Sequence, residues 1–208
     1  MNAQKLSFRT TTNSYIISLL FAMVIALMIP TPAKADNLVQ NGGFETGDLS
    51  GWYLTGNVQN MAVGTDDPHS GQFSFDASPQ GSQGMGFISQ DFYGLGTGPG
   101  QFNYLAKWWL NLTTTPPNQF VAMWDNQVIF NLQDLGQTGY REIQIDGLQA
   151  SGTGKDTLSF GFIGNQESVW HLDDVELTQV GTPEPGSLML LGSGVVGAAA
   201  VFRRRFLS

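Results

Sequence analysis

The segment that most restricts the fold is QFNYLAKWWLNL, residues 101–112. Hydrophobic and polar residues alternate along most of it with a period of two, the pattern of a half-buried β-strand. One face of this strand is predicted to be buried; it carries Phe102, Tyr104, Ala106, Trp108, Leu110 and Leu112. Such a strand needs partner strands and a second layer that covers its apolar face, so the pattern favours a sheet-based domain.

The remainder of the central region predicts more strands and no helix. Short strands are expected at residues 72–77, 85–92, 119–124, 127–132, 142–145, 157–163 and 169–177, between turns rich in Gly, Asn and Pro. The pair Asp125-Asn126 predicts a tight hairpin, because both residue types tolerate a positive φ. The sequence therefore predicts an all-β antiparallel sandwich or barrel, without the βαβ pattern of nucleotide-binding folds.

Charge and cysteine content exclude several functional classes. All 17 acidic residues lie between Asp36 and Glu184, where the only basic residues are Lys107, Arg141 and Lys155. So acidic a surface repels phosphate backbones, which argues against nucleic acid as a partner. The absence of cysteine excludes disulfides, thiolate metal sites and cysteine nucleophiles.

The N-terminal region has the organisation of a secretory signal peptide. Lys5 and Arg9 precede an apolar run at residues 15–29, and small residues follow at Ala33 and Ala35. This order predicts a signal peptide over residues 1–35 that signal peptidase cleaves after Ala35. The exported protein would then begin at Asp36; an uncleaved N-terminal anchor is the alternative.

Three segments resemble jelly-roll domains of the carbohydrate-binding-module and galactose-binding-like type. They are NLVQNGGFETGDLSGW at residues 37–52, HSGQFSF at 69–75 and VWHLDDVEL at 169–177. The resemblance implies a jelly-roll β-sandwich over residues 36–180. The first and last strands of a jelly roll can lie side by side, so Glu45 is expected near Asp173 and Asp174.

These three carboxylates are a candidate metal site. Adjacent carboxylates in an apolar strand repel each other, unless a cation or hydrogen bonds compensate for their charge. Similar jelly rolls hold a structural calcium through a Glu of the opening motif and an Asp of the closing strand, which implies Glu45 with Asp173 or Asp174 as ligands here. The alternative is that one aspartate is solvated while the other caps a turn.

The polar face of the strand at residues 101–112 is a candidate glycan site. It carries Trp109 beside Lys107, Asn103 and Asn111, and a flat indole among hydrogen-bonding groups can stack on a sugar ring. We call these four residues the tryptophan platform. The alternative is a Trp109 covered by a loop or by the second sheet.

Catalytic motifs are lacking, so we expect a domain that is not an enzyme. His69 and His171 are the only histidines, and there is no G-x-S-x-G motif. A glycan hydrolase, the least favoured alternative, would need two carboxyl groups facing each other across a cleft.

The C-terminal segment, residues 181–208, has three parts in a fixed order. Pro183, Glu184 and Pro185 come first, an apolar stretch at 187–202 follows, and Arg203, Arg204 and Arg205 come last. As a helix the apolar stretch would be about 24 Å long, short of the roughly 30 Å hydrocarbon core, so it predicts a weak transmembrane anchor. The arginines predict a cytoplasmic C-terminus.

This arrangement resembles the PEP-CTERM sorting signal, the substrate of exosortases. The resemblance implies a Gram-negative bacterium that makes exopolysaccharide, a transient anchor in the inner membrane, and cleavage by an exosortase-type membrane enzyme near residues 183–185. The protein would then reach the cell envelope or the extracellular biofilm matrix; a permanent tail anchor is the alternative. We expect an exported domain that binds or organises exopolysaccharide, with a self-associating structural protein as the runner-up.

Overall fold

The computed structural model describes residues 36–79, 83–96, 103–113, 116–164, 169–180 and 194. The predicted signal peptide with Ala33 and Ala35, the Pro183–Pro185 motif and the arginines at 203–205 lie outside these residues, as does all but Gly194 of the predicted helix at 187–202. Within the described part, no helix is both long enough and apolar enough to cross a membrane.

The described part is built from β-strands. They are β1 (Tyr53–Gly56), β2 (Met61–Gly64), β3 (Ser74–Ala77), β4 (Gly86–Tyr93), β5 (Asn103–Leu112), β6 (Gln119–Trp124), β7 (Gln127–Gln133), β8 (Thr138–Gln149), β9 (Lys155–Ile163) and β10 (Trp170–Val180).

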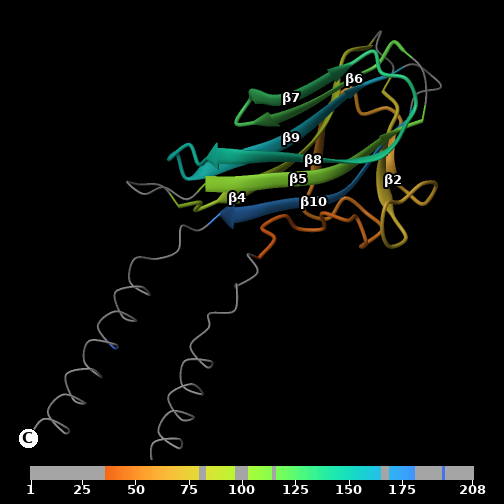
Figure 1. Cartoon of the computed structure of the whole chain (residues 1–208). Helices are drawn as coiled ribbons and strands as arrows, with labels where there is room; N and C mark the ends of the chain where they lie inside the picture. The colour runs from red at the N-terminus through yellow and green to blue at the C-terminus, as the bar shows by residue number, and fades with distance from the viewer. Residues whose placement is uncertain are drawn as a thin grey trace, which may run out of the picture. The chain divides into compact units, whose positions relative to one another are not determined.

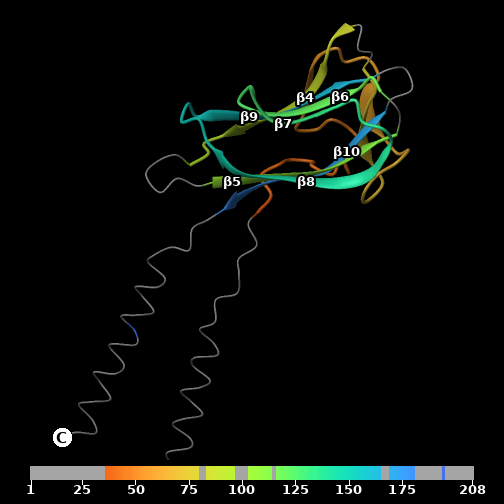
Figure 2. The ribbon, with the colours of Figure 1, turned by 45° about the horizontal axis from the view of Figure 1, so that its top comes forward.

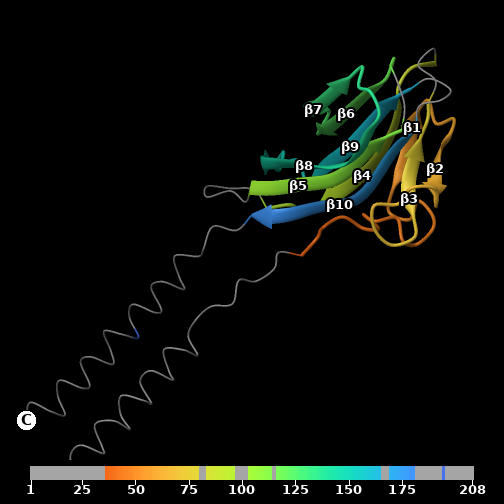
Figure 3. The ribbon, with the colours of Figure 1, turned by 45° about the vertical axis from the view of Figure 1, so that its right-hand side comes forward.

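The strands form two antiparallel sheets that pack face to face. The first sheet has the order β1-β4-β9-β6-β7, and the second has the order β2-β3-β10-β5-β8. Figure 1 shows β5, β8 and β10 side by side, and Figure 2 shows them as one layer beneath β4, β6, β7 and β9. In Figure 3, β2 and β3 run at a steep angle to β5 and β8, as the twist of strands in a sheet requires. The predicted all-β jelly-roll sandwich is therefore confirmed.

The core lies between the sheets and is rich in aromatic rings. The predicted inner face of β5 is buried, with Tyr104, Ala106, Trp108, Leu110 and Leu112 at most 3% exposed. At the centre, the Phe120 ring contacts five other aromatic side chains, those of Trp108, Phe130, Phe160, Phe162 and Trp170. Within the described part of the chain, the residues of the buried cluster fall between Val39 and Leu177, inside the domain predicted at residues 36–180.

Most of the predicted strands are present, and the differences in length have a physical reason. β6 has the predicted bounds, whereas β8 is much longer than the predicted 142–145. β8 is an edge strand, and nine of its twelve residues are exposed or polar. Few apolar residues are therefore left to mark its full length in the sequence. The edge strands β1 and β2 were not predicted, because their residues, YLTG and MAVG, do not alternate between apolar and polar.

The hairpin between β6 and β7 confirms the predicted turn. Asp125 and Asn126 have φ values of 49° and 64°, both in the left-handed region. A two-residue turn of this kind matches the right-handed twist of the flanking strands.

The segment before β1 is fastened to β10 by one side chain. The Asn37 Oδ1 accepts hydrogen bonds from the backbone N–H groups of Val39 and Leu177, each at 3.0 Å, and its Nδ2 donates to the Val175 carbonyl at 3.1 Å. Asn37 also pairs with Thr178 as an isolated antiparallel bridge. The two ends of the domain therefore lie side by side, as Figure 1 shows, and the predicted pairing of the first and last segments is confirmed.

We predict that Asn37→Ala lowers the free energy of unfolding of residues 36–180 by about 1–3 kcal/mol. The substitution leaves two backbone N–H groups and one carbonyl of a partly buried region without their partner. Urea denaturation measures the loss. Asn131→Ala is the matched control, because its amide makes only an exposed contact with Gln119, and we expect a change below about 0.5 kcal/mol. Equal effects of the two substitutions would contradict the prediction.

Candidate functional site

The three predicted calcium ligands come together around Gly43. A β-carbon placed at Gly43 would lie 3.4 Å from Asp174 Oδ1, 3.7 Å from Asp173 Oδ1 and 3.7 Å from Glu45 Cγ. Asp173 and Asp174 reach this place because β10 has a bulge there, with Asp174 at a φ of 47°. The expected proximity of the opening and closing motifs is thus confirmed.

In the structure, these carboxylates hold the loop that leads into β3. Glu45 accepts hydrogen bonds from the backbone N–H groups of Gln72 and Phe73, at 3.0 and 3.1 Å from Oε1. Its carboxylate also lies over Gly71, where φ is 62° and any side chain would collide with it. This contact explains why a glycine stands at that position of the loop.

The two aspartates bind the same loop at His69 and Ser70, before the residues that Glu45 contacts. Asp173 Oδ2 accepts from the backbone N–H groups of His69 and Ser70 at 2.9 and 3.1 Å. Asp174 pairs with the His69 ring at 2.7 Å and accepts from the Ser70 hydroxyl at 2.8 Å. The two aspartates and Glu45 therefore fix residues 69–73 through directed hydrogen bonds.

The chemistry of this cluster suits calcium, although its present geometry does not gather the ligands at one point. Asp173 is fully buried, and burial raises the pKa of its carboxyl group to about 6. A hard divalent cation would stabilise the ionised form of such a group. Among the described residues, no three acidic or histidine side chains are arranged as a metal site. The calcium site, with Glu45, Asp173 and Asp174 as ligands, stays a prediction.

We predict that millimolar calcium raises the melting temperature of residues 36–180 by several degrees over the chelator-treated protein. A ligand at about 100 times its dissociation constant stabilises the folded state by about 2.7 kcal/mol. Differential scanning calorimetry with and without chelator measures the shift, and Asp173→Asn should abolish it. Equal melting temperatures for the untreated and the chelator-treated protein would exclude the site.

The tryptophan platform is partly covered in the structure. The Trp109 ring is stacked on the His69 ring, with 3.9 Å between the centroids and 14° between the planes. Tyr140 packs edge-on against the same histidine and donates a hydrogen bond to the Asp67 carbonyl. The loop held by Asp173 and Asp174 therefore already occupies one face of the indole.

The other members of the platform have partners of their own or lie apart. Asn111 is 6% exposed and donates to Asp67 Oδ2 at 2.5 Å. Lys107 lies 3.1 Å from Glu176 and 3.5 Å from Glu142, and Glu176 is the main cause that raises the pKa of its ammonium group. Asn103 is exposed at the far end of β5. The tryptophan platform stays a prediction, with a smaller open surface than the sequence indicates.

The outer face of the first sheet presents a different set of polar and aromatic groups. Tyr53 of β1 and Tyr93 of β4 are 41% and 72% exposed. Tyr53 pairs with Ser89 of β4, so Asp91 lies along β4 between that position and Tyr93. On the neighbouring strand β9, Thr157 lies opposite Asp91 and Lys155 lies opposite Tyr93. We call Tyr53, Asp91, Tyr93, Lys155 and Thr157 the tyrosine face.

Asp91 is the centre of the tyrosine face. It accepts hydrogen bonds from the Tyr53 hydroxyl at 3.0 Å, the Thr157 hydroxyl at 2.8 Å and the Lys155 ammonium at 2.9 Å. Burial opposes its charge, but these three donors outweigh burial and lower the pKa of Asp91. The result is an ionised carboxylate that holds Tyr53 and Lys155 in fixed positions.

A hollow of about 320 Å³ adjoins the tyrosine face. Asp91 and Tyr93 line it, together with Gln90 and residues of the segment before β1, such as Gln40. Two hydrogen bonds hold its wall in place. The Gln90 Oε1 accepts from the Gln40 backbone N–H at 2.8 Å, and the Gln90 Nε2 donates to the Gln40 carbonyl at 2.9 Å. The face therefore combines exposed aromatic rings, directed polar groups and a concave rim.

Sequence reasoning missed the tyrosine face, although part of its signal was present. Asp91 lies in the strand predicted at residues 85–92 and Tyr93 directly follows that strand, and both alternate with the buried Ile88 and Phe92. Alternation thus marks them as outward residues. It does not reveal that Tyr53 and Lys155, from strands far apart in sequence, meet there.

Two segments match known protein families. Residues 36–98 match a carbohydrate binding domain, and residues 182–205 match the PEP-CTERM protein-sorting motif. The chain carries a PEP-CTERM sorting motif and a carbohydrate-binding domain. The matched part of the domain contains Tyr53, Asp91 and Tyr93 of the tyrosine face, as well as Glu45. No curated protein is similar enough to count as a match.

Solved structures share the fold of the β-sandwich at low sequence identity. TmCBM61 in complex with β-1,4-galactotriose has a TM-score of 0.56 and 16% identity, over 70% of this chain and 100% of that chain. The CBM22-1 xylan-binding domain of Paenibacillus barcinonensis Xyn10C has a TM-score of 0.50 and 12% identity, over 73% and 99%. A cyclase from Fischerella sp. TAU in complex with 4-(1H-indol-3-yl)butan-2-one has a TM-score of 0.51 and 11% identity, over 73% and 100%. These similarities establish the fold alone, because one architecture supports both binding modules and a cyclase.

Proposed function

We propose that this chain is an exported surface protein whose β-sandwich binds exopolysaccharide. The observation that carries the proposal is the tyrosine face, where two exposed tyrosines flank an ordered group of polar side chains beside a hollow. The match of residues 36–98 to a carbohydrate binding domain supports the same function.

The spacing of the two tyrosines suits an extended chain of sugars. Tyr53 pairs with Ser89, and Tyr93 lies four residues further along β4, about 14 Å away at roughly 3.4 Å per residue. Aromatic rings stack on the C–H faces of sugars, while Asp91 and Lys155 supply an acceptor and a donor for hydroxyl groups. The face can therefore contact more than one monosaccharide at a time.

We infer that the domain binds glycans without cleaving them. Hydrolysis of a glycosidic bond needs two carboxyl groups, one of which must hold a proton near neutral pH. The tyrosine face contributes a single carboxylate, Asp91, and its pKa is lowered. The match of residues 36–98 to a carbohydrate binding domain supports a binding role.

The runner-up, a structural protein that self-associates through its strand edges, has less support. The edge strands β1 and β2 have four residues each, and the long edge strand β8 carries charges at Arg141, Glu142 and Asp146, whereas the seven-residue edge strand β7 has no charged residue. Short or charged edges oppose strand addition. Val128 of β7 is the large apolar side chain that these edges expose most, at 59%.

We predict that Tyr53→Ala and Tyr93→Ala each weaken binding of residues 36–180 to the host's exopolysaccharide by about tenfold. Loss of one stacking ring removes roughly 1.4 kcal/mol, which corresponds to that factor. Affinity electrophoresis on gels containing the polysaccharide measures the effect. Val128→Ala is the control, because it removes an exposed apolar side chain of the same sheet outside the tyrosine face.

Other outcomes would contradict the proposal in distinct ways. If Trp109→Ala abolishes binding while both tyrosine variants bind normally, the tryptophan platform is the site. If wild-type protein does not bind but sediments as large assemblies, the structural alternative holds. Release of reducing ends from the polysaccharide would show that the domain is an enzyme.

We further propose that the C-terminal signal is removed by an exosortase-type enzyme after signal peptidase has cleaved behind Ala35. The match of residues 182–205 to the PEP-CTERM motif supports this sequence of events. The protein would be held briefly in the inner membrane, with its arginines in the cytoplasm, and then be released to the envelope or the matrix.

Mass spectrometry of the protein purified from its host tests this order of processing. We expect an N-terminal peptide that begins at Asp36 and a C-terminal peptide that ends before the arginines at 203–205. Retention of the arginine cluster on the surface-exposed protein would refute processing and favour a permanent tail anchor. A variant with Pro183 and Pro185 replaced by Ala should retain the cluster and serves as the size marker.

A further inference from the structure

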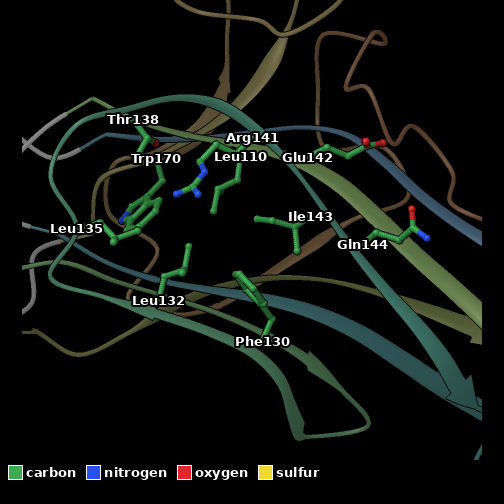
Figure 4. A pocket seen from close by; sticks show the side chains of 10 residues that line it. All are labelled: Leu110, Phe130, Leu132, Leu135, Thr138, Arg141, Glu142, Ile143, Gln144 and Trp170. Carbon is green, nitrogen blue, oxygen red and sulfur yellow. The ribbon is translucent and has the colours of Figure 1, made fainter.

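A second concave site lies at the open side of the sandwich, between the edge strands β7 and β8. It is a pocket of about 340 Å³, and its apolar wall is formed by Leu110, Phe130, Leu132, Leu135, Ile143 and Trp170 (Figure 4). Its volume is within the range of small-molecule sites. It shares no residue with the tyrosine face.

The pocket is open to solvent rather than sealed in the core. Phe130, Leu132, Leu135 and Ile143 are only partly buried, whereas Leu110 and Trp170 at its base are 3% and 1% exposed. The Trp170 Nε1 donates to the Ile163 carbonyl at 3.1 Å, so its polar atom is engaged. The pocket therefore offers a ligand a rigid apolar base and accessible apolar walls.

One charged side chain enters this apolar site. Arg141 of β8 lies opposite the buried Leu110 of β5, so it is on the inner side of the sheet. In Figure 4 the Arg141 side chain points toward the space beside Trp170, whereas Glu142 and Gln144 point away from it. A guanidinium group therefore stands at an apolar pocket in a domain with few basic residues.

Arg141 forms no ion pair with any residue in the described part of the chain. The two lysines of that part both have carboxylate partners, Lys107 with Glu142 and Glu176 and Lys155 with Asp91. Across the same described ranges, Arg141 has no ion pair and no side-chain hydrogen bond. Its planar fork of donors is available for a carboxylate, which it can hold in a bidentate manner.

We propose that this pocket binds a small monocarboxylate with an apolar body, such as an aryl- or alkyl-carboxylate. The carboxylate would pair with Arg141, and the body would fill the space between Phe130, Leu132 and Trp170. A sugar fits this pocket less well, because its walls are mostly hydrocarbon and would leave hydroxyl groups unpaired. The site is thus separate in place and in chemistry from glycan binding.

Isothermal titration of residues 36–180 with 3-phenylpropionate tests the proposal, with 3-phenylpropanamide as the uncharged control. We expect saturable binding of the carboxylate with a dissociation constant below about 1 mM, typical of a good ligand of that size. The amide should bind at least about tenfold more weakly, since it cannot form the charge-assisted pair. Equal affinities, or no saturable binding of the carboxylate, would overturn the proposal.

Two variants separate a binding role for Arg141 from a structural one. Arg141→Gln should weaken carboxylate binding at least about tenfold and leave amide binding unchanged, because only the charge-assisted pair is lost. Asn126→Asp makes the same change in net charge at the β6–β7 turn and should bind both probes as the wild type does. An inward charge on an edge strand can also serve to prevent strand addition. If Arg141→Gln promotes self-association but binds the carboxylate normally, that is its role and the proposal fails.

Discussion

The pairing of β10 with strands on both of its sides is the constraint on which the other features depend. β10 lies between β3 and β5, and the segment at Asn37 fastens the start of the domain to its end. The bulge after Asp173 interrupts this pairing at one place. Because of that interruption, two adjacent aspartates both reach the loop at residues 69–73, which then covers Trp109.

The two outer surfaces of the sandwich use their carboxylates differently. On the second sheet, Asp173 is buried and its hydrogen bonds hold the loop that covers one face of Trp109. On the first sheet, Asp91 stays near solvent and orders the groups around it, and the tyrosines beside it remain exposed. A carboxylate that organises an open surface is available to a ligand, whereas one that fastens a loop mainly supplies stability. This contrast is why we place glycan binding on the first sheet.

Sequence patterns predicted those parts of the fold that depend on local periodicity. Alternation at residues 101–112 identified the buried face of β5, and the Asp125-Asn126 pair identified a hairpin. The motifs of the first and last segments also placed Glu45 near the aspartates. What alternation could not show is which outward residues a loop covers. Trp109 is on the predicted outer face of β5, and only the structure shows that the loop with His69 covers one face of its ring while the Tyr53 ring stays exposed.

The adjacency of the domain's two ends has a mechanical consequence. If the protein is attached to the cell through its C-terminal end while the tyrosine face holds a polysaccharide, tension enters the domain at Val180. That residue ends a strand bonded to β5 along its length and, further in, to β3. A pull along β10 would load many of these hydrogen bonds together, in shear, rather than open them one after another. The central position of the last strand would therefore give the domain resistance to a force applied at its C-terminal end.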